Sequence, residues 1–186
     1  MRRQVKGMGC TKKSNRKWVH IFLLWLAILA VAIVPRIVKE PTERTAYRFL
    51  RVIDGDTIEV QRGQEAVSVR LIGVDAPESV HPDEERNTQF GLAATDYAEE
   101  LLSQTAYVYL EYDREQYDSY NRLLAYVYWD DEAAFEESLN YRLVENGYAV
   151  NSEYKPNVKY ANELQKACER AKEQRKGLWE TEGLFN

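Results

Sequence analysis

Cysteine and histidine are scarce in this 186-residue chain, which holds two of each. So few residues of these kinds exclude a disulfide scaffold, a cysteine-rich zinc module and a metal centre built on a histidine pair. Long apolar runs are also rare, since the sequence has one, near the amino terminus. With 45% hydrophobic and 30% charged residues, the chain is neither a disordered tail nor a multispan membrane protein.

Positive charge is unevenly distributed along the chain. The formal net charge is -5, but residues 1–35 contain seven cations and no acid. The remainder therefore carries 18 cations against 30 acids. Basic patches supply most of the affinity of nucleic-acid-binding proteins, so charge alone argues against such a role for the folded part.

The amino-terminal region has the pattern of a targeting segment. A basic stretch, residues 1–17, precedes Trp18–Val34, which is apolar except for His20. One interpretation is a signal peptide with a cleavage site at Ala30-Val31-Ala32. The other, which we favour because the apolar run continues past that point, is a single transmembrane anchor over residues 18–34. In both cases residues 1–17 stay in the cytoplasm, and the domain is extracytoplasmic, either membrane-anchored or secreted.

Downstream of a linker at residues 35–44, the apolar periodicity predicts one domain over 45–180 and a short tail at 181–186. The expected order is three strands, a helix, two strands and two helices. This order indicates an α+β, mostly β fold, namely a five-stranded Greek-key barrel of the OB-fold type with three flanking helices. The expected strands are Tyr47–Ile53, Thr57–Gln61, Ala66–Gly73, Ala106–Tyr112 and Leu123–Trp129, and the expected helices are Gly91–Leu102, Phe135–Glu145 and Asn157–Lys176.

Two short motifs carry possible chemistry. Asp54-Gly55-Asp56-Thr57 alone is a common turn, and the segment from Arg70 to Glu78 alone is a strand running into a proline-containing loop. Together they place Asp56 and Asp75 at the ends of adjacent strands, where the two carboxylates can share a hard cation such as Ca²⁺. Arg70 can then direct its guanidinium at a phosphate beside that cation, and Glu78 can hold and deprotonate a water molecule.

A third motif, Asp118-Ser119-Tyr120-Asn121-Arg122, opens the predicted strand Leu123–Trp129. Alone it is an ordinary turn with a solvated arginine. Arg122 becomes a candidate because a phosphoryl transition state needs its negative charge neutralised from more than one side.

These motifs give the chain, from about Tyr47 to Trp179, a resemblance to the thermonuclease, or staphylococcal nuclease-like, family. The order of the motifs and the spacing from Asp56 to Arg122 fit the family pattern without gaps. Besides the motifs above, the matching stretches are Val69–Glu78, Tyr120–Tyr128, Tyr154-Lys155-Pro156-Asn157 and Gly177-Leu178-Trp179.

The resemblance implies a Ca²⁺-dependent phosphodiesterase that hydrolyses DNA and RNA to fragments with 3′-phosphate and 5′-hydroxyl ends. It implies a monomer that prefers single strands. The roles that it implies are Ca²⁺ ligation by Asp56, Asp75 and the carbonyl of Ala76, general-base catalysis by Glu78, phosphate binding by Arg70 and Arg122, and substrate contacts by Tyr120 and Tyr154.

The chain departs from the family where secreted relatives carry lysines and a second tyrosine. Acidic residues fill the loop at Asp83-Glu84-Glu85, and serines stand at positions 119 and 152. We therefore expect weak ground-state binding with an intact catalytic set. A non-catalytic binding module, for nucleic acid or protein at the cell envelope, is the alternative, and a structural envelope protein is a third interpretation.

Overall fold

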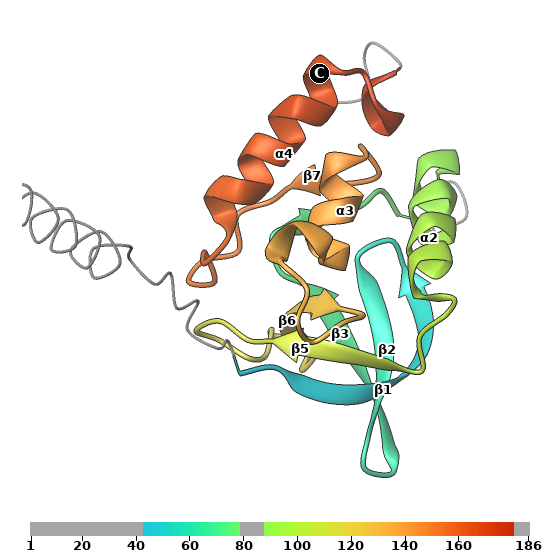
Figure 1. Cartoon of the computed structure of the whole chain (residues 1–186), viewed down its shortest axis with the longest axis vertical. Helices are drawn as coiled ribbons and strands as arrows, with labels where there is room; N and C mark the ends of the chain where they lie inside the picture. The colour runs from blue at the N-terminus through green and yellow to red at the C-terminus, as the bar shows by residue number, and fades with distance from the viewer. Residues whose placement is uncertain (1–42, 79–87, 181–186) are drawn as a thin grey trace, which may run out of the picture. The chain divides into compact units, whose positions relative to one another are not determined.

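The computed structural model describes residues 43–78 and 88–180, and the structural statements below concern these residues. Their main feature is a closed barrel of five strands in the order β1-β2-β3-β6-β5, accompanied by three α-helices (Figure 1). The expected barrel and its three helices are therefore confirmed. The barrel strands are β1 (Thr45–Asp54), β2 (Thr57–Arg62), β3 (Glu65–Leu71), β5 (Tyr107–Glu111) and β6 (Leu123–Tyr128), and the helices are α2 (Gln89–Leu102), α3 (Leu139–Glu145) and α4 (Ala161–Glu173).

The barrel closes through one parallel pair. Strands β1, β2 and β3 form an antiparallel meander, and β3 then pairs in parallel with β6, with Arg70 opposite Leu124. All six residues of β6 are buried. This agrees with the apolar character of both faces of that strand in the sequence, because α3 packs on β6 outside the barrel.

The helix expected over Phe135–Glu145 is wrong in its extent. A short 3₁₀ turn, η2 (Phe135–Glu137), comes first, and α3 starts only after Ser138. Ser138 has an extended backbone, and its hydroxyl oxygen accepts a hydrogen bond from the Tyr141 N–H at 3.1 Å. A serine that caps a helix in this way favours a new helix start over continuation of the turn before it.

The last helix is also shorter than expected, since α4 begins at Ala161 rather than Asn157 and ends at Glu173. The side-chain oxygen of Asn157 accepts hydrogen bonds from the backbone N–H groups of Arg114 and Glu115, and its amide donates to the Glu115 carbonyl. The residue is thus fixed to a distant loop in a non-helical position. The helical spacing in the sequence does not reveal such a long-range bond.

A two-stranded sheet, β4 (Val74–Asp75) and β7 (Val150–Asn151), was not expected, because each strand is too short to show a pattern. It starts just after Gly73, whose φ of +76° ends β3 in a turn that an L side chain rarely adopts. Buried Asn140 fixes this corner, since its amide donates to the Ile72 carbonyl at 2.9 Å and its oxygen accepts from Val127 N–H at 2.9 Å. Asp75 is therefore held at a defined place beside the barrel.

Several predictions concern residues outside the described part of the chain. They are the basic segment 1–17, the anchor or signal segment 18–34, nearly all of the linker 35–44, the acidic loop at Asp83-Glu84-Glu85 and the tail 181–186. They stay predictions. Within residues 43–78 and 88–180, no helix has the length and apolar character needed to cross a membrane.

A buried cluster of charges joins the start of the domain to the barrel. The side chain of Glu111, at the end of β5, is 0% exposed. Its carboxylate accepts hydrogen bonds from the Tyr128 and Tyr160 hydroxyls at 2.9 and 2.8 Å and lies 2.7 Å from Lys159 Nζ. Arg44 Nε lies 3.6 Å from the same carboxylate, and the Arg44 guanidinium also covers the Tyr128 ring. The pairing offsets the desolvation of all these charges.

We predict that Glu111→Leu destabilises the protein strongly, because Arg44 would remain buried without its counter-charge. Loss of one partner of a buried pair costs about 3–5 kcal/mol in the free energy of unfolding. Urea unfolding at neutral pH measures this quantity. The matched control is Glu59→Leu, which breaks the Arg51–Glu59 pair at an arginine 62% exposed and should cost about 1 kcal/mol or less. Equal effects of the two variants would contradict the prediction.

Candidate active site

An open cleft of about 430 Å³ lies where β1 ends, β2 begins and β3 ends. The residues that the sequence predicts for a metal site and for catalysis come from four separate segments of the chain. Together they line this cleft: Asp56, Arg70, Asp75, Ala76, Glu78 and Arg122. The fold thus brings the six predicted positions into one place.

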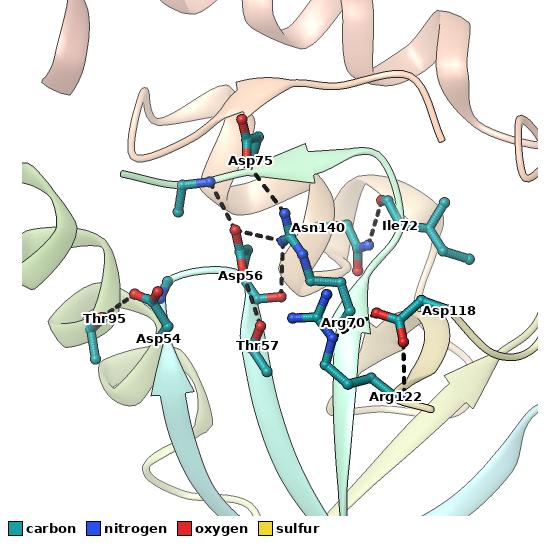
Figure 2. A network of polar contacts seen from close by, with 12 residues as sticks. Asp54, Asp56, Thr57, Arg70, Ile72, Asp75, Thr95, Asp118, Arg122 and Asn140 are labelled. Atoms are coloured by element: carbon teal, nitrogen blue, oxygen red, sulfur yellow. Dashed lines mark hydrogen bonds and ion pairs between the residues drawn. The ribbon is translucent and has the colours of Figure 1, made fainter. Parts of the chain in front are cut away.

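Arg70 joins the two predicted metal-binding carboxylates. Its Nη1 lies 2.5 Å from Asp56 Oδ2, and its Nη2 lies 3.3 Å from Asp75 Oδ1 (Figure 2). Nη1 also donates to the Asp56 carbonyl oxygen at 3.3 Å. Because one guanidinium reaches both side chains, the carboxylates of Asp56 and Asp75 are close enough to face a single cation.

Asp56 is a buried carboxylate, 7% exposed. Burial raises the pKa of this carboxyl above its ordinary value, although the Arg70 guanidinium and hydrogen bonds from Ala76 N–H and the Thr57 hydroxyl oppose the rise. The bond from Ala76 N–H to Asp56 Oδ2, 3.1 Å long, also joins the end of β4 to the start of β2. A buried acid in this position favours a nearby positive charge.

The oxygen donors of these residues are of the kind that suits a hard cation such as Ca²⁺. Within the described part of the chain, no group of three or more histidine, cysteine, aspartate or glutamate side chains is arranged to hold a metal. Asp56 and Asp75 would therefore supply two carboxylates, with a backbone carbonyl and water completing the shell. Ca²⁺ accepts such a mixed set of six to eight oxygens with irregular geometry.

Two glycines allow the cleft segments to approach α2. A Cβ on Gly91 would lie 2.3 Å from the carbonyl oxygen of Glu78, and a Cβ on Gly55 would lie 2.7 Å from Ala94 Cβ. The Thr88 N–H donates to the same Glu78 carbonyl at 2.9 Å. The backbone of Glu78 is thus fixed against the first turn of the helix, which sets where its carboxylate can reach.

Arg122 is held by an acid of its own. Its Nε lies 2.6 Å from Asp118 Oδ2, while Asp118 Oδ1 accepts the backbone N–H groups of Tyr120 and Arg122 at 2.9 Å each. Figure 2 shows Asp118 at the Nε edge of Arg122, with the rest of the guanidinium extending toward Arg70. Both arginines line the cleft, so it presents two guanidinium groups to one ligand.

A family model described as staphylococcal nuclease homologue matches residues 68–181 of the chain. The thermonuclease of Staphylococcus hyicus is 37% identical over 133 residues, which cover 72% of this chain and 75% of that protein. The thermonuclease of Staphylococcus intermedius is 39% identical over 135 residues, covering 73% and 76%. The SPbeta prophage-derived endonuclease YokF of Bacillus subtilis is 33% identical over 134 residues, covering 72% of this chain and 43% of that protein.

The chain belongs to the staphylococcal nuclease family. This establishes the resemblance drawn from the motifs, and it agrees with the closed barrel and its three helices. The family model covers Arg70, Asp75, Glu78 and Arg122, and Asp56 lies upstream of the matched residues.

The two predicted substrate-binding tyrosines lie outside the set of residues that line the cleft in the described structure. Tyr120 is 80% exposed, and the Arg122 guanidinium lies 5.5 Å from its ring. It therefore stands beside the cleft as an open aromatic surface. Tyr154 is half-buried against the core and bridges to Asn157, so its contact with substrate stays a prediction.

Sequence reasoning missed three residues at this staphylococcal nuclease site, two that line the cleft and one that orients Arg122. Ser68 lines the cleft, and its position two residues before Arg70 on a strand is a signal that could have identified it. Asp118 was regarded as part of an ordinary turn, although it lies four residues before Arg122. Asp54 also lines the cleft, and its carboxylate accepts the Gly55 N–H at 2.7 Å and the Thr95 hydroxyl at 3.5 Å (Figure 2).

The Asp118 carboxylate should stabilise the fold fully above about pH 4 and lose this contribution as the pH falls further. Burial of the Asp118 carboxyl acts to raise its pKa, but hydrogen bonds from Arg122 and Tyr120 and the Arg122 charge outweigh it, so the pKa is lowered. A carboxyl with a lowered folded-state pKa stabilises above its unfolded value near 3.9, and this contribution disappears as pH falls through the folded value.

We predict that Asp118→Asn lowers the free energy of unfolding by about 1–3 kcal/mol at pH 7, because charge-assisted hydrogen bonds are lost. At pH 3 the difference from wild type should shrink. Urea unfolding at both pH values measures it, with Asp96→Asn on the exposed face of α2 as the control. A difference that stays constant between pH 7 and pH 3 would show that the Asp118 charge is unimportant.

Proposed function

We propose that the protein is a Ca²⁺-dependent phosphodiesterase that hydrolyses DNA and RNA, preferably single-stranded, to 3′-phosphate and 5′-hydroxyl ends. Membership of the family supports a nuclease, a hydrolase acting on ester bonds. The observation that carries the finer proposal is the shared cleft, in which Arg70, Arg122 and Glu78 lie with a converging pair of carboxylates.

The two arginines bind the scissile phosphate. A guanidinium offers paired N–H donors that match phosphate oxygens, and two of them approach the phosphate from different segments of the chain. Asp118 occupies the Nε edge of Arg122, so it orients the remaining donors before substrate arrives. Fixed donors stabilise the charge that grows on the phosphoryl oxygens without having to reorganise during the reaction.

Glu78 activates the attacking water. Glu78 lines the same cleft as Arg70 and Arg122, and it lies three residues beyond Asp75, the last residue of β4. As the general base, Glu78 accepts a proton from the water as it attacks the phosphorus. The bond from phosphorus to the 5′ oxygen breaks in line with this attack, and that oxygen takes a proton from solvent to become the 5′-hydroxyl. No histidine lines the cleft among the described residues, and the mechanism requires none.

Asp56, Asp75 and the carbonyl of Ala76 would hold the Ca²⁺ ion. When bound, the ion polarises a phosphate oxygen and neutralises part of its charge. With two carboxylates as its charged ligands, the affinity should be low, on the order of 10⁻⁴–10⁻³ M, as in extracellular calcium modules. This range matches an extracytoplasmic location, which we propose from the segments 1–17 and 18–34, with the protein tethered to the membrane or secreted as a monomer.

We predict that the purified protein degrades single-stranded DNA with Ca²⁺ and stops when a chelator is added. Glu78→Gln and Arg122→Ala should each lower kcat by about 10²–10³-fold, the usual cost of losing one transition-state contact. Release of 3′-phosphate fragments measures the rate. The matched control is Glu173→Gln on the exposed side of α4, which should retain wild-type activity.

Two outcomes of this assay would contradict the proposal. Wild-type protein that binds DNA and never cleaves it, at any Ca²⁺ concentration, would favour the alternative of a binding module. Cleavage that survives Glu78→Gln unchanged would remove Glu78 from the role of general base.

We also predict weak binding that depends strongly on salt and Ca²⁺. Outside residues 1–35 the chain has 18 cations against 30 acids, so we expect the attraction for phosphate to be concentrated at Arg70, Arg122 and the metal. Fluorescence anisotropy with a labelled oligonucleotide and the Glu78→Gln variant measures binding without cleavage. Affinity should fall as salt rises and when Ca²⁺ is chelated. Tight binding that ignores Ca²⁺ would refute this account of the charge.

A further inference from the structure

A second pocket opens beside the cleft and has the opposite chemical character. It has a volume of about 200 Å³, and its wall is formed by Pro77, Phe90, Val150 and Leu178. Asp75 and Ala76 line this pocket as well as the cleft, so the apolar pocket borders the proposed metal site. Val150 is the cross-strand partner of Asp75 in the small β4–β7 sheet, which places the apolar wall directly behind the acid.

We infer that this pocket receives the base of a nucleotide next to the scissile phosphate. The inference rests on the proposed nuclease function, because the occupant must belong to a strand already bound in the cleft. Ala76 and Pro77 are adjacent in the chain, so the wall of the pocket starts one residue from the proposed carbonyl ligand. A strand held at the cleft therefore has a base within one nucleotide of the pocket.

The pocket is chemically suited to a nucleobase rather than to phosphate or sugar. Its side walls are aliphatic and aromatic, and half-buried Phe90 offers a ring on which a base can stack. Stacking on an aromatic side chain is available to every base, since each has a π-face. No lysine or arginine is among the described residues that line the pocket, so it offers no charge to hold a phosphate, and the base is the part of the nucleotide that suits it.

The volume further selects the kind of base. A protein cavity of roughly 150 Å³ accepts one benzene ring. A pocket of about 200 Å³ therefore has room for the single ring of a pyrimidine, whereas more of the double ring of a purine would extend out of it. The nuclease should accordingly cleave faster where a thymine, cytosine or uracil occupies this position.

The test uses the full-length protein and short single-stranded DNA substrates with one cleavable phosphodiester bond. One substrate carries thymine on both sides of that bond, and two others are abasic on the 5′ or the 3′ side. Wild-type kcat/KM should fall for one abasic substrate by about 5- to 150-fold, which corresponds to the loss of one stacked base. Phe90→Ala should cause a similar fall with the thymine substrate and no further fall with that abasic substrate.

The matched control is Leu92→Ala on the same helix, 55% exposed and outside the pocket, which should behave as wild type. A second variant, Val150→Ala, widens the pocket and should raise the adenine-to-thymine ratio of kcat/KM. An unchanged ratio, or a Phe90→Ala effect that is equal for all substrates, would overturn the inference while leaving the nuclease intact. Wild-type protein inert on every substrate would instead refute the proposed function.

Discussion

The site depends on the compensation of two negative charges that the fold forces together. Asp56 directly precedes β2 and Asp75 lies in β4, and two carboxylates so close together are stabilised by a cation between them. Arg70 provides that cation from β3, with one Nη atom for each acid. The hydrogen bond from Ala76 N–H to the Asp56 carboxylate holds the same two segments together. The same contacts therefore hold these segments together and balance the charges of Asp56 and Asp75.

The second arginine, Arg122, is held by contacts that do not involve Asp56 or Asp75. Asp118 holds Arg122 through its side chain and its backbone, and Asp118 does not line the cleft with the acids that pair with Arg70. The cleft thus contains two positively charged groups whose orientations respond to different acids. A ligand that draws Arg70 away from Asp56 and Asp75 leaves the position of Arg122 unchanged.

The sequence was sufficient for features with a local signal. Alternating and helical periodicity located the five barrel strands and the three helices, and the spacing of Asp56, Arg70, Asp75, Glu78 and Arg122 predicted a common site. It was insufficient where a bond between distant residues decides the structure. Asn157 is held by the loop at Arg114 and Glu115, so α4 starts later than the pattern predicts. Ser138 caps α3, so the segment that the apolar pattern predicts as one helix is divided in two.

Residues of the site were missed for related reasons. In the described structure Asp118 bonds to Arg122 and to its own turn, and the same sequence pattern also fits a solvent-exposed turn, so the pattern did not reveal its role. The apolar pocket is assembled from α2, β7 and the residues after α4, and no single stretch of sequence contains its chemistry. By contrast, the six residues that line the cleft and were predicted occur in short motifs in which the neighbours of each one are informative.

The contacts of Glu78 have a consequence for how this nuclease can change. Thr88 N–H binds the Glu78 carbonyl, and Gly91 lets the same backbone rest on α2, so both ends of the segment between Glu78 and Thr88 are anchored to the domain. Both contacts are made by the backbone at Glu78, Thr88 and Gly91, and neither depends on a side chain of the segment between them. Evolution, or a protein engineer, need not keep a particular sequence in that segment in order to keep these two contacts.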